Sequence, residues 1–195
     1  SCLGAGFNLA LRDLEIRGAG NLLGAAQSGH IAVIGFGLYC QLLRRTIARI
    51  KGEAPPLLVD VDLDFDFLDF SPGAIDPGRS ACLPYSYVED EAHRMILHRR
   101  IAEAVTVNEV RALRDEVADR YGKPPPPVLR LLSLAELRVI AARKKIGRIE
   151  TREGKIFFYR QRERSPILFN GHLPGLKGRD TGQCLAGIFR LLQTL

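Results

Sequence analysis

The sequence predicts an α+β fold, in which a helical hairpin segment and an acidic linker strand precede a mixed helix and antiparallel-sheet C-terminal domain. Three observations lead to this fold class. Apolar residues recur at helical spacing in residues 1–52 and again between residues 89 and 146. Residues 59–67 alternate between apolar side chains and aspartate, which is the period of a half-buried strand. Residues 148–159 have the pattern of a β-hairpin with its turn at residues 152–154.

Composition divides the chain into three regions, which we expect at residues 1–52, 53–80 and 81–195. The middle region holds seven acidic residues and one basic residue, whereas both flanking regions are basic. It also carries the pairs Pro72-Gly73 and Pro77-Gly78, which are typical of turns and linkers. The 195 residues, 46% of them hydrophobic, suffice for one large or two small domains. We therefore expect the domain boundary to fall within the acidic region.

Residues 1–52 are expected to form two helices joined by a glycine-rich turn. The first helix has Phe7, Leu11 and Leu14 on one face, and the second extends from about Gly35 to Lys51. Four cations in the second half of this second helix are candidate contacts for DNA or another anion: Arg44, Arg45, Arg49 and Lys51. A solvated helix face is the alternative interpretation. The same alternatives apply to a second basic cluster, made of Arg138, Arg143, Lys144, Lys145 and Arg148.

The C-terminal region should begin with two helices. The pattern predicts the first helix at residues 89–104 and places four residues on its inner face: Ala92, Met95, Ile96 and Ala102. Thr106 and Glu109 have the spacing of a capping box, which marks the start of the second helix. This helix is expected to end at Gly122 and to bury Val110, Leu113, Val117 and Tyr121.

A third helix should follow the proline run at residues 124–127 and continue to Ile146. The hairpin comes next, and residues 165–170 have a composition that would suit a further strand. Asp180 is expected to cap a last helix that buries Leu185, Ile188 and Leu191.

Composition also restricts the classes of function. The net charge of +6 and the pI of about 9.4 favour an anionic partner such as nucleic acid, although an ordinary basic surface has the same composition. The four cysteines form no CxxC pair, which argues against a zinc site and fits a reduced cytoplasmic protein. No apolar run is long enough for a membrane span. The sequence lacks a GKT or GKS phosphate loop, a DExH box, a catalytic triad and metal-ligand spacing, so we expect no catalytic residue, metal site or cofactor in this chain.

A glycine-rich segment at residues 13–29 is the most distinctive part of the sequence. It reads D-L-E-I-R-G-x-G-x-L-L-G-x-x-Q-S-G and carries Arg17 and Gln27 on a backbone of closely spaced glycines. Because glycine permits positive φ and tight turns, the segment is expected to be a joint that holds two hydrogen-bonding side chains. The structural alternative is that Arg17 caps the preceding helix and Gln27 satisfies a turn.

This segment resembles the TRG motif, which follows the second motor domain in RecG-type branch-migration helicases and in transcription-repair coupling factors. The resemblance implies that Arg17 and Gln27 couple ATP hydrolysis to translocation along double-stranded DNA, and that Gly18, Gly20 and Gly24 shape the joint. Since this motif normally follows a motor and the chain starts without Met, we expect a C-terminal part of a longer protein.

Two further runs, residues 83–102 and 112–132, resemble the C-terminal domain of the transcription-repair coupling factors. The best-marked part is D-R-Y-G at residues 119–122, followed by Pro124. The resemblance implies an ATP- and Mg²⁺-dependent DNA translocase that displaces stalled RNA polymerase and recruits the excision-repair protein UvrA. It also implies that residues 81–195 restrain the protein through an intramolecular contact with an N-terminal domain. A RecG-type remnant and a free-standing nucleic-acid- or protein-binding module are the alternatives.

Overall fold

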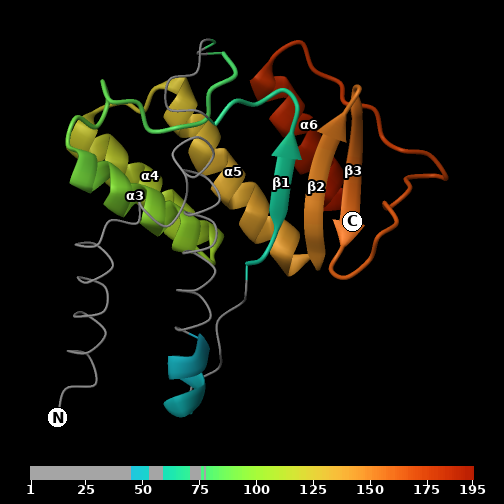
Figure 1. Ribbon diagram of the computed structural model, residues 1–195, viewed down its shortest axis with the longest axis horizontal. Helices are drawn as coiled ribbons and strands as arrows, with labels where there is room; N and C mark the ends of the chain where they lie inside the picture. The colour runs from blue at the N-terminus through green and yellow to red at the C-terminus, as the bar shows by residue number, and fades with distance from the viewer. Residues whose placement is uncertain (1–44, 53–58, 71–75, 77) are drawn as a thin grey trace, which may run out of the picture.

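The computed structural model describes residues 45–52, 59–70, 76 and 78–195 (Figure 1). Residues 45–50 are helical. The elements that follow are, in chain order, β1 (Asp62–Phe65), α3 (Glu91–Glu103), α4 (Val107–Tyr121), α5 (Pro126–Arg143), β2 (Ile146–Arg152), β3 (Lys155–Arg160) and α6 (Thr181–Thr194). This combination of helices with one small sheet confirms the α+β class. Of the helical hairpin predicted at residues 1–52, residues 1–44 lie outside the described residues.

The sheet has the strand order β1-β2-β3, with β2 in the middle. Strands β2 and β3 form the predicted antiparallel hairpin, and Glu153 and Gly154 turn the chain with φ values of 50° and 71°. Strand β1 pairs with β2 in parallel, so the prediction of a purely antiparallel sheet was wrong. Parallel neighbours need a long crossover, and here α3, α4 and α5 lie between β1 and β2 in the chain (Figure 1).

Strand β1 confirms the alternation that its sequence predicts. Val59, Val61 and Phe65 are buried, whereas Asp60 and Asp62 are exposed. The buried side chains belong to the same core as the helices and the hairpin. The acidic segment therefore supplies an edge strand of this sheet. The predicted domain limits themselves stay a prediction.

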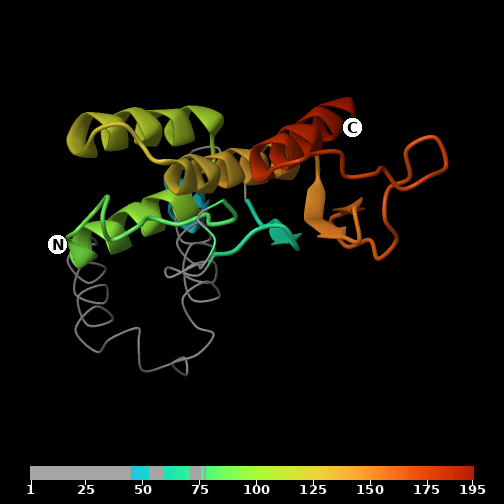
Figure 2. The ribbon, with the colours of Figure 1, turned by 90° about the horizontal axis from the view of Figure 1, so that it is seen from above.

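The core lies between the sheet and the helices α5 and α6. Helix α5 packs on β2 and contacts α6, and the two helices cover one face of the sheet (Figures 1 and 2). The largest completely buried side chains include Leu132, Leu137, Ile149, Phe158 and Ile188 of these elements, and Val110 and Val117 of α4 belong to the same core. The opposite face of the sheet is therefore free to carry polar side chains.

Helix α3 starts at Glu91, two residues after the predicted start, and turns a different face to the core. The Asp90 side chain accepts a hydrogen bond from the His93 backbone N–H and caps the helix. Ala92, Met95 and Ile96 are exposed, so their predicted burial was wrong, whereas Ala102 is buried as predicted. The buried face carries Leu97, Ile101 and an arginine, Arg94.

Arg94 explains why apolar periodicity misassigned this face. Its guanidinium donates to the carbonyls of Val88 (2.6 Å) and Glu89 (2.9 Å) and lies 4.0 Å from the centre of the Tyr85 ring. The charge is thereby satisfied locally, and the aliphatic part of the side chain packs inside. A charged residue can then occupy a core-facing position that a hydrophobicity pattern assigns to solvent.

Helix α4 has the predicted capping box, in which Thr106 Oγ1 accepts from Glu109 N–H (3.1 Å) and the Glu109 carboxylate accepts from Thr106 N–H (3.2 Å). The helix ends at Gly122, whose φ of 81° favours glycine. The Tyr87 hydroxyl donates to the Gly122 carbonyl (2.7 Å), which ties the D-R-Y-G run to the segment before α3.

Two boundaries differ from prediction. Helix α5 ends at Arg143, and Ile146 begins β2 because Lys145 adopts a left-handed φ of 60° that stops the helix. Residues 165–170 form no strand of the sheet; Ile167 N–H donates to the Phe158 carbonyl (2.7 Å), and Phe169 makes only an isolated bridge. The third strand of the sheet is β1 instead.

Candidate functional site

The residues predicted to couple ATP hydrolysis to translocation lie outside the described part of the chain. They are Arg17, Gly18, Gly20, Gly24 and Gln27, and their role stays a prediction. Of the predicted anion contacts, Arg44 is also outside, whereas Arg49 and Lys51 are exposed and Arg45 is half-buried.

Arg45 faces an open concave surface where the end of α5, the start of β2 and the end of β3 meet. We call this surface the basic basin. Its cations are Arg45, Arg143, Lys145, Arg148, Arg160, Arg162 and Arg164. Its carboxylates are Asp60, Asp62 and Glu163. The three arginines at 160–164 were missed from the sequence, although the local run R-Q-R-E-R is a signal that could have found them.

Backbone contacts hold the two cationic segments of the basic basin together. The Gln161 N–H donates to the Lys145 carbonyl at 3.0 Å. Gly147 permits this close approach, because a Cβ at that position would lie 3.1 Å from the Gln161 Cα. The residues after α5 and those after β3 therefore form one continuous surface.

Some members of the second predicted basic cluster bind backbone carbonyls, and the others lie on the surface. Arg138 donates to the carbonyls of Ile101 and Ala102 at the end of α3, and Lys144 donates to the Gln193 carbonyl near the end of α6. Both cations thus satisfy carbonyls that a helix end leaves unpaired. Burial lowers the pKa of Arg138 to about 10, so this side chain remains charged at neutral pH. The other members of the cluster line the basic basin.

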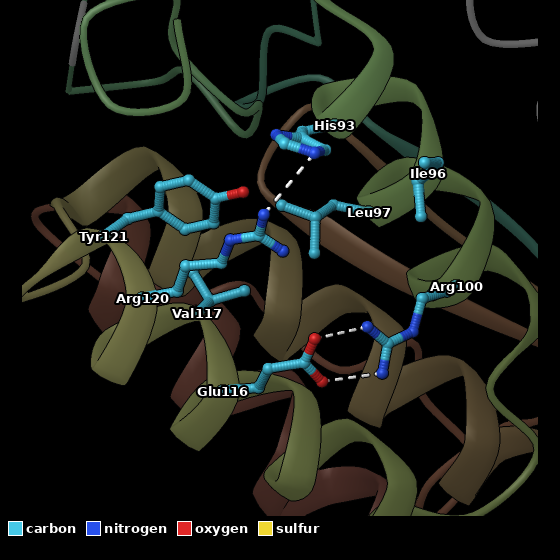
Figure 3. Close-up of a pocket in the computed structure, with 8 residues that line it drawn as sticks. All are labelled: His93, Ile96, Leu97, Arg100, Glu116, Val117, Arg120 and Tyr121. Atoms are coloured by element: carbon cyan, nitrogen blue, oxygen red, sulfur yellow. Dashed lines mark hydrogen bonds and ion pairs between the residues drawn. The ribbon is translucent and has the colours of Figure 1, made fainter. Parts of the chain in front are cut away.

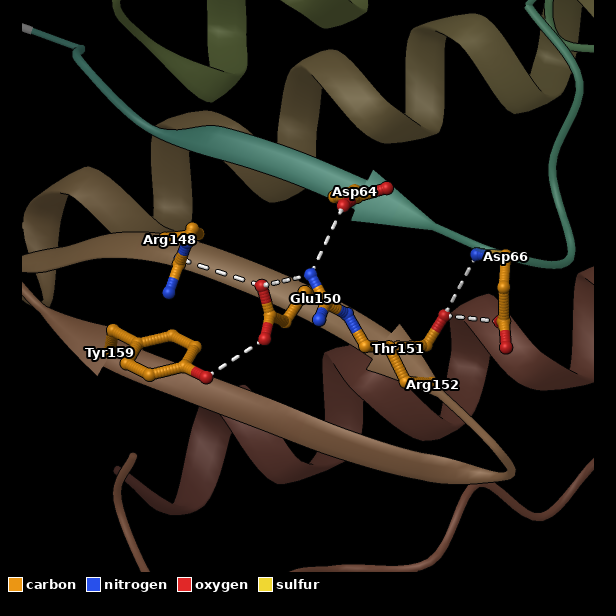
Figure 4. Close-up of polar contacts among 7 residues, drawn as sticks. All are labelled: Asp64, Asp66, Arg148, Glu150, Thr151, Arg152 and Tyr159. Atoms are coloured by element: carbon orange, nitrogen blue, oxygen red, sulfur yellow. Dashed lines mark hydrogen bonds and ion pairs between the residues drawn. The ribbon is translucent and has the colours of Figure 1, made fainter. Parts of the chain in front are cut away.

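A polar network covers the outer face of the sheet (Figure 4). Glu150 is only 4% exposed, and its carboxylate accepts a hydrogen bond from the Tyr159 hydroxyl at 2.8 Å. Arg148 and Arg152 each lie 3.6 Å from the same carboxylate, and the Arg148 guanidinium lies 4.2 Å from the centre of the Tyr159 ring. Burial, together with the hydrogen bond and charge of Glu150, raises the pKa of Tyr159. The network holds Arg148 in a defined position at the edge of the basic basin.

A second concave surface lies between α3 and α4, and we call it the α3–α4 groove (Figure 3). It is lined by His93, Ile96, Leu97, Arg100, Glu116, Val117, Arg120 and Tyr121. Arg100 donates two hydrogen bonds to the Glu116 carboxylate, at 2.5 and 2.7 Å. Arg120 lies 3.4 Å from His93 Nε2. The groove therefore combines an apolar floor with charged side chains of fixed orientation.

The Arg100–Glu116 pair is expected to make stability depend on acid pH. The hydrogen bond from Arg100 lowers the pKa of Glu116 below its usual 4.5. The contribution of the pair to the free energy of unfolding is complete above pH 4.5 and is lost as the pH falls through the lower pKa that Glu116 has in the folded state. Glu116→Gln should lower the free energy of unfolding by no more than about 1 kcal/mol at neutral pH, because both side chains of the pair are partly exposed to solvent. Urea titrations should show this difference vanishing in acid; a difference that is independent of pH would contradict the assignment.

Other reactive groups are few in the described residues. Cys82 and Cys184 are free and buried, and burial raises the pKa of the Cys184 thiol. Within the same residues, no group of three or more His, Cys, Asp or Glu side chains could hold a metal ion. No described helix has both the length and the apolarity needed to cross a membrane.

The chain is similar to known proteins along most of its length. Residues 78–168 match the TRCF domain family. A transcription-repair-coupling factor from Myxococcus xanthus is 41% identical over 137 residues, which is 70% of this chain and 10% of that protein. The one from Escherichia coli is 38% identical over 173 residues (88% and 14%), and the one from Bacillus subtilis is 35% identical over 151 residues (76% and 12%).

The fold also matches a solved structure. The crystal structure of the C-terminal domain of a transcription-repair coupling factor aligns with a TM-score of 0.53 and 15% identity, covering 69% of this chain and 91% of that one. The chain spans only 10–14% of the length of the three relatives named above. Residues 78–168 accordingly form a domain of the TRCF family, and the chain around them is similar to transcription-repair coupling factors.

Proposed function

We propose that the chain is the C-terminal part of an ATP-dependent double-stranded DNA translocase that displaces stalled RNA polymerase and recruits nucleotide excision repair. The observation that carries this proposal is the TRCF match at residues 78–168, together with relatives that carry this name and are much longer. ATP and Mg²⁺ would bind in other parts of the whole protein, and the whole protein would act in the cytoplasm. Residues 13–29 would pass the motor's movement to the DNA.

In this proposal the α3–α4 groove makes the intramolecular contact that restrains the protein. The groove would dock on an N-terminal domain and cover the surface to which UvrA binds. Ile96, a large apolar side chain that lines the groove, is 43% exposed, and Met95, the preceding residue of α3, is 61% exposed. Apolar anchors next to oriented charges are typical of specific protein interfaces. The bidentate Arg100–Glu116 pair and Arg120 supply such charges here.

The test is to disrupt this surface in a whole coupling factor. Ile96→Glu or Arg120→Ala should release the contact and strengthen UvrA binding by at least about tenfold, which corresponds to about 1.4 kcal/mol. UvrA affinity is measured by titration with labelled UvrA, and ATPase activity is recorded in parallel.

Two control variants make equivalent charge changes on exposed positions of α4 that do not line the groove. Asn108→Glu adds the same negative charge as Ile96→Glu, and Arg111→Ala removes the same positive charge as Arg120→Ala. Both controls should bind UvrA like the unmodified protein. The restraining role is wrong if removal of residues 81–195 leaves UvrA binding and ATPase activity unchanged.

A further inference from the structure

We infer that the basic basin binds the phosphate backbone of duplex DNA. The inference rests on the proposed function, in which duplex DNA is the substrate, and it assigns a DNA contact to the C-terminal sheet and helices in addition to the predicted contact at Arg44–Lys51. Three features of the surface support it: the availability of its charges, the way its residues are held, and the absence of features that other ligands need.

The charges of the basic basin are available for a ligand. Seven of its lining residues are cations and three are carboxylates. Arg143, Lys145, Arg160, Arg162 and Arg164 are exposed, and none of them forms an ion pair with a carboxylate in the described part of the chain. Exposed like charges repel one another, so an anion that bridges them would relieve the repulsion.

The cations come from segments that only the folded chain brings together. Arg45 belongs to the helical residues 45–50, Lys145 follows α5, and Arg162 follows β3. Lys145 and Arg162 have φ values of 60° and 68°, a region that glycine and asparagine occupy more easily. Long cationic side chains therefore stand at turn positions where the backbone conformation alone would favour a smaller residue. Sparsely populated backbone conformations of this kind are common at functional sites.

The chemistry of the surface fits phosphate better than other anionic partners. Six of the seven cations are arginines, whose planar guanidinium matches phosphate geometry. An acidic peptide would need apolar anchors, and the basin offers none: Ala142 is buried, and the remaining described lining residues are polar, charged or glycine apart from Tyr159. Tyr159 is itself buried, and Arg148 covers its ring.

The covered Tyr159 ring also favours duplex over single-stranded DNA. Single strands are generally held by bases that stack on exposed aromatic rings, and no described residue of the basin offers one. Contacts would therefore go to phosphates and would not depend on base sequence. Asp60 and Asp62 occupy the β1 side of the basin, and Asp62 is the cross-strand neighbour of Arg148. Their charge should direct the DNA toward Lys145 and residues 160–164.

The experiment measures binding of the 195-residue chain to a short labelled duplex of random sequence by fluorescence anisotropy at several salt concentrations. The basin variant is Arg160→Gln with Arg164→Gln. The loss of two phosphate contacts should weaken binding roughly 50-fold at about 0.1 M salt and reduce the slope of log K against log salt by about two. Asp60→Asn should strengthen binding, because it removes a carboxylate from the basin.

The matched control is Arg111→Gln with Arg179→Gln, which removes the same charge from exposed positions outside the basin. Its affinity should stay within about threefold of the unmodified chain, since only long-range, screened charge is lost. Circular dichroism melting verifies that both double variants remain folded.

Three results would overturn the inference: equal losses in the basin and control variants, tighter binding of a single strand than of the duplex, or displacement of the duplex by polyglutamate at equal charge concentration. Failure of the basin assignment can be distinguished from failure of the translocase proposal. If the basin variant keeps its duplex affinity, the basin assignment fails while the translocase proposal stands. If an Arg17→Ala coupling factor still translocates, the proposed coupling fails whatever the basin binds.

Discussion

Replacing Arg17 by alanine in a whole transcription-repair coupling factor is expected to abolish translocation along DNA while ATP binding is retained. Gln27→Ala should have the same effect. A translocase needs an element with two discrete arrangements that follow the state of the nucleotide. The rigid fork of a guanidinium and the donor and acceptor of a carboxamide can exchange partners between two such arrangements of a glycine-rich joint. Displacement of stalled RNA polymerase and release of a triplex-forming strand measure translocation directly.

The matched control for this experiment is Asn21→Ala in the same segment. Asn21 stands between the glycines but at a position that the motif leaves open, so its replacement should preserve translocation. ATP affinity of all three variants is measured with a fluorescent nucleotide. Unimpaired polymerase displacement by the Arg17 and Gln27 variants would refute the coupling role of residues 13–29.

Phe65→Ala is expected to lower the free energy of unfolding of the chain by about 3–5 kcal/mol, the usual effect of removing a buried aromatic side chain. Phe65 is 3% exposed, lies in β1 and stacks on Phe67 with ring centres 5.4 Å apart. It belongs to the same core as the helices and the hairpin, so the loss should destabilise all of them together. Denaturant titration should give a lower midpoint with an unchanged slope.

Asp64→Ala provides the control, because Asp64 is the adjacent residue of β1 but points to solvent. Its nearest cation, Arg152, is 4.0 Å away, and both side chains are largely exposed. The substitution should therefore change the free energy of unfolding by no more than about 0.5 kcal/mol. Hydrogen exchange of the β2 backbone amides compares the two variants at the strand that pairs with β1. If Phe65→Ala left the unfolding of residues 78–195 unchanged, residues 59–70 would be a tether and not part of this core.

Features specified within a few residues were predictable from sequence. The capping box at Thr106 and Glu109, the turn at Glu153-Gly154 and the Asp180 cap of α6 all form as expected. Each depends on hydrogen bonds or backbone angles among neighbouring residues, so the local sequence contains the whole cause. The alternation of Val59–Phe67 belongs to the same class, because its period of two reflects which strand face is buried.

Errors arose where a distant partner decided the outcome. The pattern of α3 favoured Met95 and Ile96 as buried, but the carbonyls of Val88 and Glu89 satisfy Arg94 and allow it to occupy the inner face. Arg138 looked like a surface cation in the sequence, but it donates to carbonyls at the end of α3. In both cases the arginine is held away from solvent by backbone carbonyls outside its own helix, which a pattern of residues within that helix cannot reveal.

The sequence by itself determined the resemblance to the TRCF domain, through residues 83–102 and 112–132, and the alternation of the acidic strand with its aspartates in solvent. Only the tertiary structure decided that β1 pairs in parallel with β2 and that the cations after α5 and β3 share one surface. The reason is physical. Helix caps, turns and alternation arise from forces between neighbours in the chain, whereas strand pairing and a shared charged surface depend on which distant segments the core brings together.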